Sequence, residues 1–112
     1  MSSDRFAPLP EPPYLAVIFS NQMATDDSGY AQMADKMLEL AQTQPGFLGA
    51  ESTRDASGFG ITVSYWKDEA SIARWKSNGE HIKARDLGNK KWYEYYNLRV
   101  AKVERSYSGP AT

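Results

Sequence analysis

The 112-residue sequence contains no cysteine and only one histidine. The absence of cysteine excludes disulfides, iron–sulfur clusters, thiolate zinc sites and cysteine nucleophiles. A single histidine excludes a metal site built from several histidines of one chain, although carboxylates or a symmetry-related chain could still supply ligands. The chemistry of any reaction site therefore has to come from oxygen, nitrogen and aromatic side chains.

The sequence also lacks an excess of charge and any long apolar run. Thirteen basic residues face fourteen acidic ones, for a formal net charge of -1, so we expect no nucleic-acid partner and no attraction to an anionic membrane. The longest apolar runs are far shorter than the ~20 residues that a membrane span requires. The N-terminus has no cationic start followed by an apolar core, as a signal peptide would. We expect a cytoplasmic protein without a membrane partner.

Proline, in contrast, is concentrated at the N-terminus. Residues 1–13 carry four prolines, which cannot donate to a sheet and favour extended conformations. We expect these residues to form an arm, either disordered or draped over a partner subunit. One domain follows over 14–107, and 108–112 is expected to be a C-terminal tail.

The domain itself shows alternating strand and helix periodicities. Alternation of apolar and polar residues predicts a first strand with Leu15, Val17, Phe19 and Asn21 on one side. A helical stripe follows, then a hairpin, then a second helical region that Gly79 breaks or kinks. The predicted strands cover 14–23, 47–54, 59–66 and 96–107, and the predicted helices cover 28–43 and 69–96. The order βαββαβ predicts an α+β, ferredoxin-like split βαβ fold, with two helices on one face of a four-stranded antiparallel sheet.

The second face of such a sheet has no element left to cover it. It carries Val, Ile or Phe at several positions, and an exposed apolar patch of that size is unusual in a monomer. We therefore predict a homodimer that packs through the open sheet face.

Three stretches resemble a known family. They are "PGFLGAES" before the hairpin, "YWKDEASIARWKSNGEHIKA" at the strand-to-helix junction, and "LRVAKVERSY" at the last strand. Together they resemble the antibiotic biosynthesis monooxygenase (ABM) domain family, from about Tyr14 to Tyr107. The resemblance implies a dimeric α/β barrel. For some members it also implies oxygen insertion into aromatic polyketides without metal or flavin, so we expect no cofactor.

An oxygenase without a cofactor requires a base, an aromatic-lined apolar pocket and exclusion of bulk water. His81 is the candidate catalytic base, because it is the only side chain whose unperturbed pKa lies near neutrality. Phe19 could also line the pocket. The candidate substrate-binding residues, for a small planar aromatic or quinol-like molecule, are Asn21, Trp66, Trp75, Arg85, Trp92 and Tyr93.

The sequence leaves two other interpretations open, a non-catalytic module and haem degradation. Trp75 and Trp92 can be core residues, since large aromatics dominate small cores, and His81 can have only a structural role. The chain can then be a non-catalytic small-molecule-binding module. A haem-degrading branch of the relatives resembles it through Asn21 and Trp75, but that branch's haem-ligating histidine falls near Arg85. Haem degradation is therefore disfavoured, because a guanidinium stays protonated and cannot ligate iron.

Overall fold

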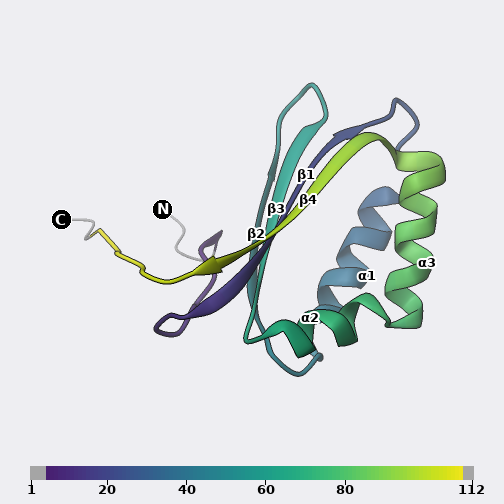
Figure 1. Ribbon diagram of the computed structural model, residues 1–112. Helices are drawn as coiled ribbons and strands as arrows, with labels where there is room; N and C mark the ends of the chain where they lie inside the picture. The colour runs from purple at the N-terminus through teal and green to yellow at the C-terminus, as the bar shows by residue number, and fades with distance from the viewer. Residues whose placement is uncertain (1–4, 110–112) are drawn as a thin grey trace.

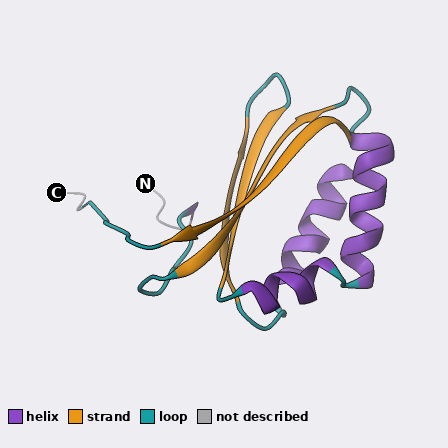
Figure 2. Ribbon diagram, viewed as in Figure 1, coloured by secondary structure: helices purple, strands orange, loops and turns teal. Residues whose placement is uncertain are grey.

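One antiparallel sheet carries all the described helices on one of its faces (Figure 1). The computed structural model describes residues 5–109. The strands are β1 (Tyr14–Met23), β2 (Phe47–Arg54), β3 (Phe59–Trp66) and β4 (Tyr93–Val103). The helical segments are α1 (Tyr30–Gln42), α2 (Glu69–Lys76), α3 (Gly79–Leu87) and the π-helical turn η2 (Gly88–Trp92). The strand order β2-β3-β1-β4 and the two-layer arrangement (Figure 2) confirm the predicted ferredoxin-like α+β fold.

The strand register confirms which side chains share a face. Leu15 of β1 lies opposite Trp66 of β3, and Trp66 stacks on Trp75 of α2. This side of the sheet is called the helix-facing side below, and alternation places Asn21 on it as well. The other side, called the open face, carries Ala16 opposite Tyr65.

The second helical region breaks at the predicted place. The Asn78 side chain accepts hydrogen bonds from the backbone N–H groups of Glu80 and His81 and so begins a new helix, α3, at Gly79. The region ends earlier than predicted, however: the strand β4 begins at Tyr93, whereas helical periodicity was expected to continue to residue 96. The aromatic run after Trp92 favours a strand.

The N-terminal arm lies on the open face of its own sheet, on the side away from the helices (Figure 1). The backbone N–H of Ala7 donates to Glu51 Oε2 at 2.9 Å. A Cβ at Gly49 would lie 2.8 Å from that of Ala7, so glycine is what allows the arm to approach the strand so closely. Tyr14 and Ala16 are buried at this end of the sheet. Part of the face that the sequence left uncovered is therefore covered by residues 5–13; residues 1–4 of the predicted arm lie outside the described part.

The other end of the open face stays exposed. Phe59, Ile61 and Tyr95 retain 44%, 37% and 67% of their accessible surface. The C-terminal tail, predicted over 108–112, is described to residue 109 and has no helix or strand after Val103. Within residues 5–109, no helix is long and apolar enough to cross a membrane.

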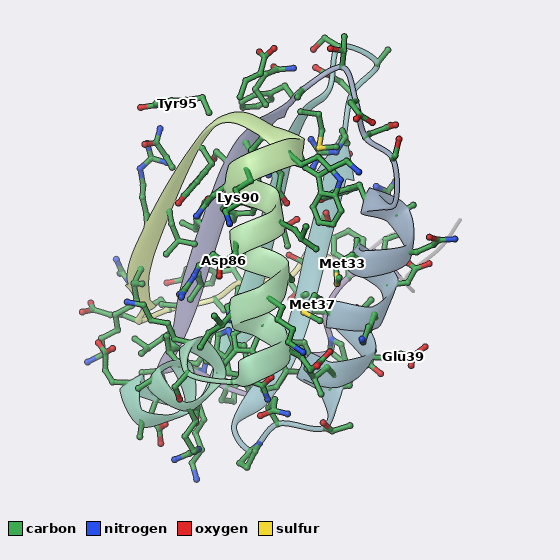
Figure 3. All side chains as sticks on the ribbon, turned by 90° about the vertical axis from the view of Figure 1, so that its right-hand side faces the viewer. Met33, Met37, Glu39, Asp86, Lys90 and Tyr95 are labelled. Atoms are coloured by element: carbon green, nitrogen blue, oxygen red, sulfur yellow. The ribbon has the colours of Figure 1, made fainter. Side chains whose placement is uncertain are left out.

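The helix-facing side of the central strand is not tightly packed. β1 has a neighbouring strand on each side, yet Leu15, Val17 and Phe19 are only half-buried. The helix α3 buries none of its residues fully. Figure 3 shows Met33 and Met37 on the side of α1 toward α3, so the two helices contact each other beside this strand. Solvent therefore reaches the space between the sheet and α3.

Candidate functional site

Three of the predicted site residues form one stack at the α2 end of the sheet. Trp66 closes β3 and lies 5.9 Å from Trp75 of α2, centroid to centroid, with an interplanar angle of 30°. Trp75 in turn stacks on the His81 ring, with 4.4 Å between centroids and 18° between planes. Trp66 is fully buried, and its indole N–H donates to Ser64 Oγ at 2.9 Å. The fold brings the two tryptophans and the histidine together, as predicted. Trp66 and Trp75 each use one ring face to stack on the other.

The hydrogen bond of His81 decides its tautomer. The ring Nδ1 lies 3.1 Å from the backbone carbonyl oxygen of Trp75. A carbonyl can only accept, so Nδ1 carries the proton in the neutral ring and Nε2 holds the free lone pair. Burial lowers the pKa of His81 below 6.5; the Trp75 carbonyl opposes this and the positive charge of Arg85 adds to it. His81 is thus a neutral imidazole at pH 7, with Nε2 available as a base.

Asn21 lies at the opposite end of the helix-facing side. It is only 2% exposed, and neither its Nδ2 nor its Oδ1 has a hydrogen-bond partner within the described residues. A buried polar group without a partner costs about 1–3 kcal/mol. Such a group is uncommon in a folded protein and marks a position where a ligand can supply the missing bonds.

Trp92 and Tyr93 lie near Asn21, at the start of β4, but they differ in what they contact. Trp92 is buried, its N–H donates to the Ser28 carbonyl at 2.9 Å, and its ring meets Tyr30 edge-on. Tyr93 is half-buried and meets Phe19 edge-on at 5.3 Å. Burial, and then its hydrogen bond to Tyr30, raise the pKa of Tyr93, so its phenol remains protonated. Trp92 thus has its polar atom satisfied, whereas the Tyr93 ring is packed edge-on between Phe19 and Tyr30.

The predicted residues therefore fall into two groups. Trp66 pairs with Leu15, six residues along β1 from Asn21, and at ~3.3 Å per residue the two ends are about 20 Å apart. Arg85 belongs to the His81 end: it follows one turn later on α3 and is exposed. No single small molecule can contact both ends at once through short side chains.

Arg54 and Tyr30, at the Asn21 end, were not among the site residues predicted from the sequence. The Arg54 guanidinium donates to the Gly58 carbonyl at 2.6 Å and to the Tyr30 hydroxyl at 3.2 Å, and it lies 5.4 Å from the Tyr30 ring centroid. Tyr93 donates its own hydroxyl proton to the same Tyr30 oxygen at 3.3 Å. The strand register pairs Arg54 with Gly60 and so puts its charged side chain on the helix-facing side of β2; no local pattern of the sequence records this pairing.

These two residues line an open hollow of about 490 Å³ between the β1–α1 connection and the β2–β3 hairpin. The hollow does not include His81 or either tryptophan of the stack. Among residues 5–109, no group of three or more His, Cys, Asp or Glu side chains is arranged to hold a metal ion.

Known proteins resemble this chain in sequence and in fold. It is 51% identical over 102 residues to the uncharacterized protein YqjZ of Bacillus subtilis (strain 168), covering 91% of this chain and 90% of that one. A shorter stretch of 49 residues is 37% identical to jasmonate monooxygenase ABM of Pyricularia oryzae, covering 44% of this chain and 23% of that protein. The fold is similar to the crystal structure of SnoaB, a cofactor-independent oxygenase from Streptomyces nogalater, with a TM-score of 0.69 and 9% identity over 88% of this chain and 99% of that one.

The family itself is established by sequence. The sequence model of the antibiotic biosynthesis monooxygenase family matches residues 16–87, which include most of β1, the hairpin, the Trp66–Trp75–His81 stack and Arg85. This match covers well over half of the chain and agrees with the residues that carried the resemblance. The chain belongs to the antibiotic biosynthesis monooxygenase family.

Proposed function

We propose that the protein is a monooxygenase that acts, without metal or flavin, on a small planar aromatic or quinol-like molecule. The observation that carries the proposal is the neutral His81. Its Nδ1 donates a hydrogen bond to the Trp75 carbonyl, and the lone pair on its Nε2 remains free to accept a proton. Family membership supports the reaction class, and SnoaB, described as a cofactor-independent oxygenase, shares the fold. The fold alone would not carry the reaction, because one fold hosts many chemistries.

The proposed chemistry begins with a proton transfer. His81 Nε2 takes a proton from a phenol, or from a methylene group beside a carbonyl, which leaves an electron-rich phenolate or enolate. That anion gives electrons to dioxygen. One oxygen atom becomes a new ring carbonyl and the other leaves as water. The reacting carbon is a CH₂ in the keto form of either substrate, so it supplies all four electrons and no external reductant is needed. Its second proton and the proton held by His81 both end on the leaving oxygen.

We assign binding roles according to the two ends of the helix-facing side. Trp75 and Arg85 lie around His81 and would contact the substrate, while the buried Trp66 supports the Trp75 ring. Asn21 and Tyr93 lie about 20 Å away, beyond the reach of the same small molecule, so any binding role of theirs would concern a separate molecule at that end. Trp92 would support this end indirectly, since its buried ring holds Tyr30.

An oxygen electrode tests this assignment. Oxygen uptake is measured with a panel of quinols and polycyclic phenols for wild type, His81→Ala, His81→Gln and the exposed α3 control Asp86→Asn. Removing a general base costs about 10²- to 10⁴-fold in rate, so both His81 variants should lose that much kcat while Asp86→Asn stays unchanged. Equal turnover by wild type and His81→Ala on every oxidised compound would remove the assigned role.

A non-catalytic binding module is the second candidate, and one observation favours it. Trp66, Trp75 and His81 stack on one another and so fill part of the space that a planar ligand would need. This alternative predicts that aromatic compounds bind without any oxygen uptake. Haem turnover is checked in the same series, since adding haemin would then produce a shifted Soret band.

We also propose that two copies pair through the open sheet face. Phe59, Ile61 and Tyr95 remain exposed there after the arm has covered the other end, and burying such a patch is favourable by about 25 cal/mol per Å² of apolar surface. Light scattering after size exclusion should give twice the mass of the 12.5 kDa chain, and Ile61→Glu should halve it. A wild-type chain that elutes as a monomer at high micromolar concentration would contradict the pairing.

A further inference from the structure

The hollow at the hairpin end of the sheet is lined by Tyr30, whose hydroxyl proton has no acceptor among the described residues. The Tyr30 oxygen already accepts two hydrogen bonds, from Arg54 Nη2 at 3.2 Å and from the Tyr93 hydroxyl at 3.3 Å. A hydroxyl has two acceptor lone pairs and one proton. Both lone pairs are used, so the Tyr30 proton is left as a donor on a residue that lines the hollow.

Arg54 supplies further donors beside it. A guanidinium has five N–H groups, and two are used, toward the Gly58 carbonyl and the Tyr30 hydroxyl, which leaves three. Within residues 5–109 the only ion pairs are those of Glu80 with Lys36 and Lys83. The positive charge of Arg54 therefore has no carboxylate partner there, although the side chain is half-buried.

Gly60 gives Arg54 its position. A Cβ at residue 60 would lie 2.7 Å from the Arg54 guanidinium carbon, closer than real contacts allow, so only glycine lets the guanidinium lie across this strand. Asn21, with its unpartnered amide, is the neighbour of Gly60 on the other side. Arg54 and the unpartnered Asn21 amide thus flank Gly60 on the helix-facing side.

Three carboxylates, of Asp27, Asp55 and Glu94, also line the hollow, and all three are exposed. Asp55 is committed to the hairpin turn, where it accepts from the Ser57 hydroxyl at 2.6 Å. Repulsion from these three charges grows with the charge of the ligand, so a dianion loses more to the rim than a monoanion, which can form the same charge-assisted hydrogen bonds with Arg54.

We propose that this hollow is a binding site for a small planar molecule that carries one carboxylate or another singly charged oxyanion, received by Arg54 and the Tyr30 hydroxyl. Charge-assisted hydrogen bonds from a guanidinium are among the stronger polar contacts, and the ring of Tyr30, which lines the hollow, supplies aromatic surface beside them. The site goes beyond the proposed oxygenase: it includes neither His81 nor the tryptophan stack, and it needs no turnover to be detected.

Isothermal titration calorimetry with three matched probes tests the site: 1-naphthoate, the neutral 1-naphthamide and the dianionic 1-naphthyl phosphate. We expect 1-naphthoate to bind wild type at least tenfold more tightly than either other probe. Arg54→Gln and Tyr30→Phe should each weaken 1-naphthoate binding at least tenfold. Arg105→Gln removes the same charge from an exposed residue beyond β4 and should leave the affinity unchanged.

Gly60→Ala keeps both donors and guards against a folding artefact. The new methyl group displaces the flexible end of Arg54 rather than backbone, so the far-ultraviolet circular dichroism should match wild type while 1-naphthoate binding falls severalfold. Three results would each overturn the proposal: no 1-naphthoate binding at millimolar concentration, equal affinity for the acid and the amide, or equal affinities of folded Gly60→Ala and wild type. Failure of the oxygen-uptake assay would leave these binding results unaffected.

Discussion

The variant Asn21→Leu should be more stable than the wild-type protein, because the Asn21 amide is buried without a hydrogen-bond partner. Asn21 is 2% exposed, and both side-chain polar atoms expose less than 1 Å² without a partner. Leucine has nearly the same shape and no polar atoms. Asn21→Leu therefore removes a desolvation cost without breaking any hydrogen bond within residues 5–109.

The expected gain follows from that cost. Leaving one buried polar group unsatisfied costs about 1–3 kcal/mol, so the free energy of unfolding should rise by about that amount. For a chain of this length, each kcal/mol raises Tm by about 4 °C, which predicts an increase of about 4–12 °C. If the amide serves a ligand, the same variant should lose binding or turnover, which is the usual trade between stability and function.

Urea unfolding followed by circular dichroism measures the effect, and an unchanged m-value would show that the unfolded state is not altered. Asn97→Leu is the matched control, because Asn97 pairs with Ser20 on the open face and is only half-buried. We expect the control to change stability by less than about 0.5 kcal/mol. If Asn21→Leu instead loses 1 kcal/mol or more, the amide has a partner and the reasoning is refuted.

Three further predictions concern the α2 end of the sheet. Gly46→Ala should cost about 2 kcal/mol or more, because residue 46 has φ +84° and a Cβ would collide with the buried Ser71 side chain; a loss below 0.5 kcal/mol in urea unfolding would contradict it. Asp68→Ala should cost about 1 kcal/mol, because its carboxylate accepts from the Ser71 N–H and hydroxyl, and a measured change no larger than that of the exposed Glu69→Ala would argue against the cap. Burial lowers the pKa of His81, so between that lowered value and pH 6.5 the unfolded chain binds more protons and stability falls as the pH falls. His81→Gln should flatten this slope, and parallel stability curves for the two proteins would refute it.

The fold could be read from the sequence because its signals are local. The alternation over β1 correctly grouped Asn21 with Leu15 on one side of the strand, since side chains of a strand alternate with a period of two. The break at Gly79 was visible as well. The end of the second helix was not, because helical periodicity through Tyr93 to residue 96 competes with the strand preference of aromatic residues, and pairing with β1 decides the outcome.

The candidate site was only partly accessible to the same reasoning. Its residue types could be chosen, and the strand-to-helix junction correctly grouped Trp66, Trp75 and His81. The role of Arg54 could not be seen, because it depends on a glycine on the neighbouring strand and a tyrosine on α1. Such contacts join residues far apart in the chain, and no local pattern records them.

The sequence by itself therefore determined the elements, their order and the family, because propensity, periodicity and turn chemistry act over a few neighbouring residues. Only the tertiary structure decided that the N-terminal arm returns to its own sheet, that His81 uses Nδ1 for a hydrogen bond and keeps the Nε2 lone pair, and that the Asn21 amide is buried without a partner. Each of these depends on which atoms meet after the strands have paired and the helices have packed. Burial and hydrogen-bond satisfaction are properties of that assembly and not of any one segment.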